Sequence, residues 1–253
     1  MSPMTQESSI AAQLRDDILR GQYRCGERLP SERDLAERFS VHRSTVRAAF
    51  KRLEQLGIAE VRPGGARVCP IEEASLEVLQ HMIALQNPPD ANLVDQTLEA
   101  ISGFLAHAAR VGSERAAGAN RTRLLSILDE MIHSEPTEER RAEFISTLGS
   151  ALVEASGNPV LALLRHGLRT HTADYFRPEH RNRPISAESI APHLLRLRGA
   201  IAAGDGSAAS EAVYGFTAVI RETLRASLEE EHARAERDAS RPADAAVGAG
   251  GER

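Results

Sequence analysis

Cysteine and long apolar runs are scarce in this chain of 253 residues. Cys25 and Cys69 are its only cysteines, too few for a disulfide framework or a cysteine-based metal motif, so we expect free thiols. No apolar run is long enough to span a membrane, and we find no secretory signal peptide. These absences favour a cytoplasmic protein that does not contact a membrane.

Catalytic constellations are also missing. We find no nucleophile–base set, no carboxylate pair suited to a cleft and no glycine loop for phosphate, since Gly64-Gly65 is too short and lies in an expected hairpin. An enzyme would need a large catalytic domain, whereas residues 71–235 show only the periodicity of helices. The sequence therefore predicts a protein that is not an enzyme and has no cofactor.

Positive charge is concentrated at the amino-terminal end. Residues 1–70 contain 12 Arg and Lys against 9 Asp and Glu, whereas residues 71–253 contain 19 against 27. Lys51 is the only lysine, so basic contacts would be made by guanidinium groups. A basic segment joined to an acidic body is typical of a protein that contacts nucleic acid through one part only.

Residues 29–57 predict two short helices joined by a tight turn. Ser31 can cap the first helix, and Ser40-Val41-His42 forms the turn. The second helix begins at Arg43 and ends near Gly57. Its apolar positions have helical spacing: Val46, Phe50 and Leu53.

A hairpin with a glycine turn follows over residues 58–68. Gly64 and Gly65 would let the turn press its backbone against a DNA groove, where a side chain would collide. Upstream, residues 9–20 have the apolar spacing of an amphipathic helix. Two helices, a recognition helix and a hairpin wing in this order define a winged helix-turn-helix.

The first turns of the helix that begins at Arg43 have the chemistry of a DNA-reading helix, because this end enters the major groove in a helix-turn-helix. The guanidinium forks of Arg43 and Arg47 suit guanine O6 and N7 or a phosphate. The hydroxyls of Ser44 and Thr45 can approach phosphates or base edges, and the helix N-terminus adds partial positive charge. The alternative is a surface helix with ordinary charges.

The run from Ile10 to Val68 resembles the DNA-binding domain of the GntR transcription regulators. The matching residues are Gly21, Gly26, Leu29-Pro30-Ser31-Glu32-Arg33, Leu35-Ala36, Val41, Arg43, Val46-Arg47, Leu53, Gly57 and the glycine wing. The resemblance implies contact with double-stranded operator DNA by Arg33, Arg43, Ser44, Thr45, Arg47, and Gly64 and Gly65 of the wing tip. His42 stands where the family usually has a Ser or Thr cap, so we expect weaker capping.

Helical periodicity continues from about Glu73, and no alternating strand pattern follows residue 70. The predicted fold is mainly α, with a winged helix-turn-helix over residues 1–70 and a bundle of about seven helices over residues 71–235. We expect the bundle to bind an effector and to dimerise. Residues 236–253, rich in Ala, Gly, Asp and Arg, are expected to form a disordered tail.

Motifs in the helical half resemble the FadR branch of the GntR regulators: Ala155-Ser156-Gly157-Asn158-Pro159, and Ala200-Ile201 before Gly204-Asp205. Features closer to the fatty-acid-responsive type are an extra helix ahead of Asn92, residues 174–179 and Tyr214-Gly215. Many relatives bind a metal through one aspartate and three histidines, and an acid through an early arginine. The resemblance places the aspartate on Ile145 and the arginine on Ile101. It places the three histidines on Gly149, on His193, and at or beside Phe216. Only His193 is of a ligand type, which implies that the metal site is lost.

The resemblance thus implies an effector pocket that is more apolar than the pocket of those relatives. Its residues are Ile101, Ile145, Gly149, His193, Tyr214 and Phe216. It could take a ligand with a long hydrocarbon part, such as a fatty acyl-CoA. In a first alternative, these residues fill the pocket and the protein is an orphan or architectural DNA-binding protein without a ligand. In a second, the protein senses another small metabolite. Ala218 and Glu222 speak against acyl-CoA, since the fatty-acid-responsive regulator has a serine and a tryptophan there.

Two further expectations concern ligands and assembly. A basic run beside Tyr175 could meet a phosphate or carboxylate of an effector, or form a solvated face: Arg165, Arg169, Arg177, Arg181 and Arg183. We also expect a homodimer that acts as a repressor, because a two-fold protein matches a palindromic operator.

Overall fold

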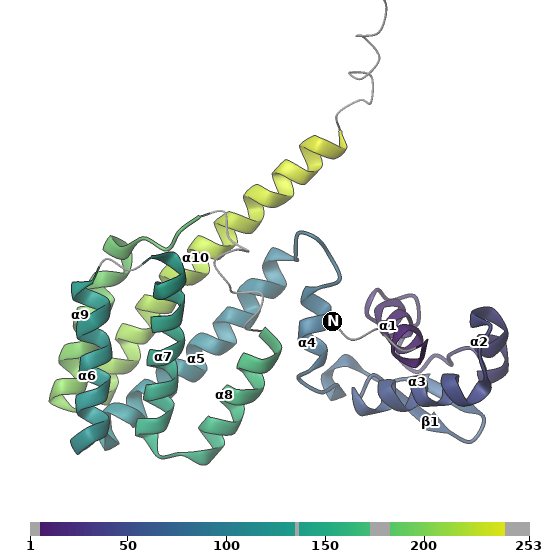
Figure 1. Cartoon of the computed structure of the whole chain (residues 1–253), viewed down its shortest axis with the longest axis horizontal. Coiled ribbons are helices and arrows are strands. Elements are labelled where there is room, and N and C mark those ends of the chain that lie inside the picture. The colour runs from purple at the N-terminus through teal and green to yellow at the C-terminus, as the bar shows by residue number, and fades with distance from the viewer. Residues whose placement is uncertain (1–5, 135–136, 173–182, 241–253) are drawn as a thin grey trace, which may run out of the picture. The chain divides into compact units, whose positions relative to one another are not determined.

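The computed structural model describes residues 6–134, 137–172 and 183–240 (Figure 1). The chain divides into two compact units, with the main boundary between Asn87 and Pro88 and with Thr170–Thr172 grouped with the first unit. Each unit has an apolar core of its own. The structure is mainly helical, which confirms the predicted fold class. Among the described residues, no helix combines the length and the apolar character that crossing a bilayer requires.

The first unit is a winged helix-turn-helix. Its elements are α1 (Gln6–Leu19), α2 (Glu32–Phe39), α3 (Arg43–Gln55), β1 (Ala59–Arg62), β2 (Gly65–Val68), the 3-10 turn η1 (Ile71–Glu73) and α4 (Val78–Ile83). The two strands form an antiparallel sheet in which Ala59 pairs with Val68 and Arg62 with Gly65. The predicted hairpin wing is therefore present, with its turn between Arg62 and Gly65.

Local capping sets the geometry of the helix-turn-helix. Ser31 Oγ accepts a hydrogen bond from the backbone N–H of Asp34 at 3.2 Å and donates one to its carboxylate at 2.7 Å, as expected for a cap of α2. Ser40 then ends α2 with a φ of 53°, in the left-handed region. His42 at the start of α3 makes no side-chain cap hydrogen bond, as its departure from the family pattern predicted.

The core of the first unit extends beyond the expected domain end at residue 70. Its largest fully buried side chains are Leu14, Leu29, Leu35, Phe50, Leu53 and Ile58. Val78 of α4 belongs to the same core, and Met82 packs against it. The segment that leads to α4 lies close to the end of α3: a Cβ on Gly57 would lie 2.8 Å from the carbonyl oxygen of Glu73. The apolar residues of α4 thus cover the helix-turn-helix.

The second unit is an all-helical bundle. Its helices are α5 (Ala91–Arg115), α6 (Gly118–His133), α7 (Glu138–Ser156), α8 (Pro159–Thr172), α9 (Ala187–Ala203) and α10 (Gly206–Ala239). Together with α4, they are the seven helices predicted after residue 70, counted over the described part of the chain. α10 continues past Glu236, where we expected the tail to begin, and residues 241–253 lie outside the described residues.

Close helix packing in the bundle depends on small residues and ion pairs. α5 lies alongside α10 (Figure 1), and Arg221 of α10 donates to both carboxylate oxygens of Asp95 in α5, at 3.0 and 2.8 Å. Where α5 meets α7, a Cβ on Gly112 would lie 2.7 Å from the carbonyl oxygen of Leu152, so the crossing requires glycine. These contacts hold α5 close to both α10 and α7.

Candidate nucleic-acid interface

α3 turns one face to the core and the other to solvent. Its buried residues are Val46, Ala49, Phe50 and Leu53. The outward face begins with Arg43 and Ser44 and continues one turn later with Arg47, while Thr45 is half-buried. The side chain of Arg43 makes no hydrogen bond or ion pair with any residue that the structure describes. Its guanidinium group is thus free to bind a partner outside the chain.

Glu32, at the start of α2, holds Arg47 in place. Arg47 Nε donates to Glu32 Oε1 at 3.0 Å and Nη2 donates to Oε2 at 2.8 Å. The hydrogen bond from Arg47 lowers the pKa of the Glu32 carboxyl, so the pair is present at neutral pH and is lost only as pH falls through this lowered pKa. The sequence did not reveal this pair because its members lie 15 positions apart on different helices.

We expect Glu32→Gln to reduce the discrimination between operator and random DNA by about tenfold, because Arg47 then loses its fixed orientation. Affinity for random duplex should not fall, since the change removes a negative charge beside the DNA backbone. Fluorescence anisotropy with both duplexes measures the two affinities. Glu37→Gln, at an exposed position of the same helix, is the matched control. An equal loss of affinity for both duplexes would contradict a positioning role for Glu32.

The wing tip carries a cation that the sequence did not predict. Gly64 and Gly65 have φ values of 100° and 129°, which favour glycine. Arg28 lies against them, and a Cβ on Gly65 would be 2.9 Å from its Nε. Its place is set by the preceding loop, where the N–H of Leu29 donates to the carbonyl oxygen of Ala66 at 2.9 Å. Only this tertiary pairing brings Arg28 to the wing, which is why no local motif pointed to it.

The predicted DNA-contacting residues all lie in the first unit and are exposed or half-buried: Arg33, Arg43, Ser44, Thr45, Arg47, Gly64 and Gly65. The side chain of Arg33 is 67% exposed, with a long ion pair of 3.7 Å to Asp34. No member of the set is enclosed in the core, as contact with a duplex requires. Their contacts with DNA stay a prediction.

The predicted effector-pocket residues lie on four helices of the second unit: Ile101 on α5, Ile145 and Gly149 on α7, His193 on α9, and Tyr214 and Phe216 on α10. Phe216 is a core residue with 4% exposure, and Ile145 packs against this core. A Cβ on Gly215 would overlap the ring of His193. Tyr214, in contrast, is 52% exposed. A common ligand-binding role for these residues stays a prediction.

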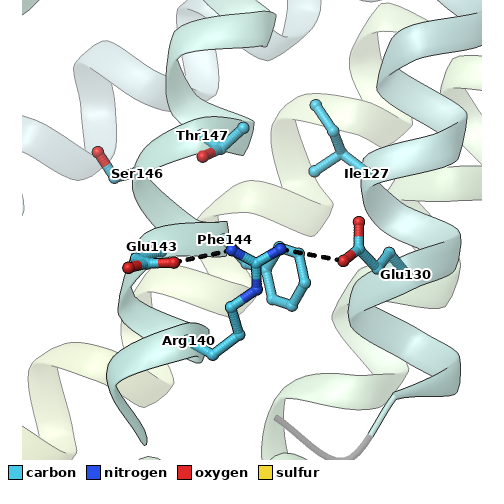
Figure 2. Close-up of a pocket in the computed structure, with 7 residues that line it drawn as sticks. All are labelled: Ile127, Glu130, Arg140, Glu143, Phe144, Ser146 and Thr147. Carbon is cyan, nitrogen blue, oxygen red and sulfur yellow. Dashed lines mark hydrogen bonds and ion pairs between the residues drawn. The ribbon is translucent and has the colours of Figure 1, made fainter. Parts of the chain in front are cut away.

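A surface pocket of about 360 Å³ between α6 and α7 involves none of these residues. Figure 2 shows Arg140 at its centre, where Nη1 donates to Glu143 at 2.8 Å and Nη2 to Glu130 at 3.2 Å. The guanidinium group also lies 4.5 Å from the centre of the Phe144 ring. Since two carboxylates already neutralise Arg140, this pocket offers no unpaired cation to a ligand.

Side chains of metal-ligand types do not gather in the part of the chain that the structure describes. Over residues 6–134, 137–172 and 183–240, no three or more His, Cys, Asp or Glu side chains are placed to share an ion. Cys25 is exposed and Cys69 is half-buried, and both are free thiols. Burial raises the pKa of the Cys69 thiol, so this group is protonated at neutral pH.

These features define a class of protein: a winged helix-turn-helix with arginines on the exposed face of its second motif helix, followed by an all-helical unit. Residues 6–68 match the family model described as bacterial regulatory proteins, gntR family, and residues 97–218 match that of the FCD domain. The chain therefore belongs to the GntR family and carries an FCD domain. Residues 6–68 are thus a DNA-binding helix-turn-helix domain of the kind found in these transcription regulators.

Two proteins that are similar in sequence to this chain are named as regulators. The HTH-type transcriptional regulator Mce2R of Mycobacterium tuberculosis is 33% identical over 144 residues, or 55% of this chain. The fatty acid metabolism regulator protein of Shewanella pealeana is 34% identical over 146 residues, or 57% of this chain. The matches span 58% and 59% of these relatives, less than two thirds of their length.

A solved structure supports the fold alone. Lar, which is described as controlling the expression of the Listeria monocytogenes agr system, superposes with a TM-score of 0.51 at 18% sequence identity. The superposition covers 91% of this chain and 99% of that chain.

Proposed function

We propose that the protein is a homodimeric repressor that binds palindromic operator DNA through α3 and the wing, and that an effector in the FCD domain relieves this binding. The observation that carries the proposal is the placement of Arg43 and Arg47 on the exposed face at the start of α3. In helix-turn-helix proteins this end of the second helix enters the major groove. Two copies related by a two-fold axis would match a palindrome and double the number of contacts.

In vitro selection of random duplexes by the full-length protein tests the proposal. We expect enriched palindromes with half-site centres about 10 base pairs, or a multiple of this, apart. Light scattering should give twice the 27.5 kDa mass of the chain. Single half-sites without symmetry, bound by a monomer, would contradict the homodimer.

The effector that we propose is an acid with a hydrocarbon part, of which a fatty acyl-CoA is one example. The name of the Shewanella relative, a fatty acid metabolism regulator protein, and the apolar residues Ile101 and Ile145 support this class. The burial of Phe216 in the core favours a second candidate, a DNA-binding regulator whose packed interior takes no ligand.

Thermal denaturation distinguishes these candidates. A ligand of the native state at a hundredfold excess over its Kd stabilises a protein by about 2.7 kcal/mol. We therefore expect fatty acyl-CoAs or carboxylic acids to raise the Tm and to release the selected operator in gel shifts. An unchanged Tm with every compound of both classes would favour the ligand-free regulator.

A further inference from the structure

Arg165 of α8 opens the basic run predicted from the sequence. Of that run, Arg183 is paired with Glu230, whereas Arg177, Arg181 and the neighbouring Tyr175 lie outside the described residues. Arg165 is half-buried against the neighbouring helix α7. Its Nε and Nη2 donate to Ser150 Oγ at 3.1 and 2.7 Å, and Nη2 also donates to the carbonyl oxygen of Ser146 at 2.6 Å. These bonds fix the guanidinium group in one orientation.

Gly149 makes the room that this guanidinium group occupies. A Cβ on Gly149 would lie 3.1 Å from Arg165 Nη1 and 3.3 Å from Leu105 Cδ2 of α5. The absence of a side chain at this turn of α7 therefore lets the cation lie between α7 and an apolar side chain of α5. An ion in such a place is poorly hydrated on one side.

The charge of Arg165 has no counterion among the residues that the structure describes. A guanidinium group has five N–H donors, yet all its acceptors here are neutral, and Nη1 has none. Burial and the positive charge of Arg169 lower the pKa of Arg165. Other arginines of this unit, in contrast, bind carboxylates: Arg140, Arg198 and Arg221. A half-buried charge is normally paired, so this guanidinium group is suited to take an anion as its partner.

We propose that Arg165 anchors the carboxylate of a small-molecule effector through Nη1, with its hydrocarbon part on the side of Leu105. Arg169 adds a second positive charge to the site, and Ser150 orients the guanidinium fork. A carboxylate fits better than a dianionic phosphate because the donors left free are those of a single nitrogen. Regulation of DNA binding by this ligand rests on the proposed function. The existence of the binding site at Arg165 does not depend on it.

Matched acid and alcohol ligands test the site. Binding of octanoate, 1-octanol and inorganic phosphate to the full-length protein is measured by thermal shift and calorimetry at constant ionic strength. We expect octanoate to bind more tightly than 1-octanol, and Arg165→Gln to lower the affinity for octanoate about 10- to 100-fold while leaving that for 1-octanol unchanged. Arg110→Gln, which changes an exposed arginine of α5, should keep the preference for octanoate.

Gly149→Ala provides a second route if Arg165→Gln does not fold. Alanine favours the helix and keeps the charge of Arg165, but its Cβ crowds Nη1, so the preference for octanoate should again decrease. Equal binding of octanoate and 1-octanol by the wild type, no binding of either, or an undiminished preference in both variants would overturn the proposal. Binding of phosphate alone would overturn the assignment to carboxylates.

Ligand binding at Arg165 and regulation of operator binding can be tested separately. Octanoate that binds at Arg165 without changing operator affinity would support the site and contradict effector-relieved repression. Loss of octanoate binding in Arg165→Gln with normal operator binding would support the site and leave the DNA-binding part of the proposed function intact.

Discussion

Replacing Arg43 by alanine is expected to abolish the gel shift of the selected operator at concentrations that saturate the wild type. Each arginine that binds a guanine edge contributes about 1–3 kcal/mol of discrimination, and a dimer has two copies. The expected loss of specific affinity is therefore at least about 30-fold. Because the Arg43 side chain is exposed and bonded to no described residue, the variant should keep the Tm and the dimer mass of the wild type.

Arg47→Ala should cause a similar loss, although it also leaves Glu32 without its partner. The control is Arg110→Ala, which removes an exposed arginine from α5 in the second unit. We expect this control to bind operator normally. Wild-type affinity in both α3 variants would contradict the assignment of α3 as the DNA-reading helix.

Salt is expected to have the second large effect. The exposed arginines on and around α3 and the wing include Arg28, Arg33, Arg43 and Arg47. If three or four of these neutralise phosphates in each protomer, the dimer would release about six to eight counterions. Its affinity should then fall about 10³-fold or more between 50 and 200 mM salt.

Anisotropy titrations over a series of KCl concentrations measure this slope. Arg28→Ala tests the wing in particular, because each lost phosphate contact reduces the slope of log K against log salt by about one. The dimer should thus lose about two units of slope, while the operator sequence preference stays the same. An affinity that hardly changes with salt would contradict phosphate contact by this surface.

Much of the first unit was predictable because its signals are local. The cap at Ser31, the spacing of Val46, Phe50 and Leu53, and the glycine turn each act within a few residues, and the structure contains all of them. The same spacing predicted the helices of the second unit. It did not predict that α4 packs on the first unit, since an apolar stripe does not identify the surface that it covers.

The parts of the site that escaped prediction depend on tertiary contacts. Glu32 meets Arg47 only because α2 and α3 cross, and Arg28 reaches the wing only because its loop pairs with β2. In the bundle, Arg165 was visible in the sequence as one charge in a basic run. The structure shows that α8 places its guanidinium group against Gly149 of α7, where its charge has no carboxylate partner among the described residues.

Photo-crosslinking of the full-length protein to its selected operator tests the central claim most directly. A duplex with a photoreactive base in each half-site is irradiated, and the crosslinked peptides are identified by mass spectrometry. The account predicts crosslinks to the start of α3, around Arg43–Arg47, and to the wing around Gly64 and Gly65. Crosslinks confined to the helices of the second unit would contradict it.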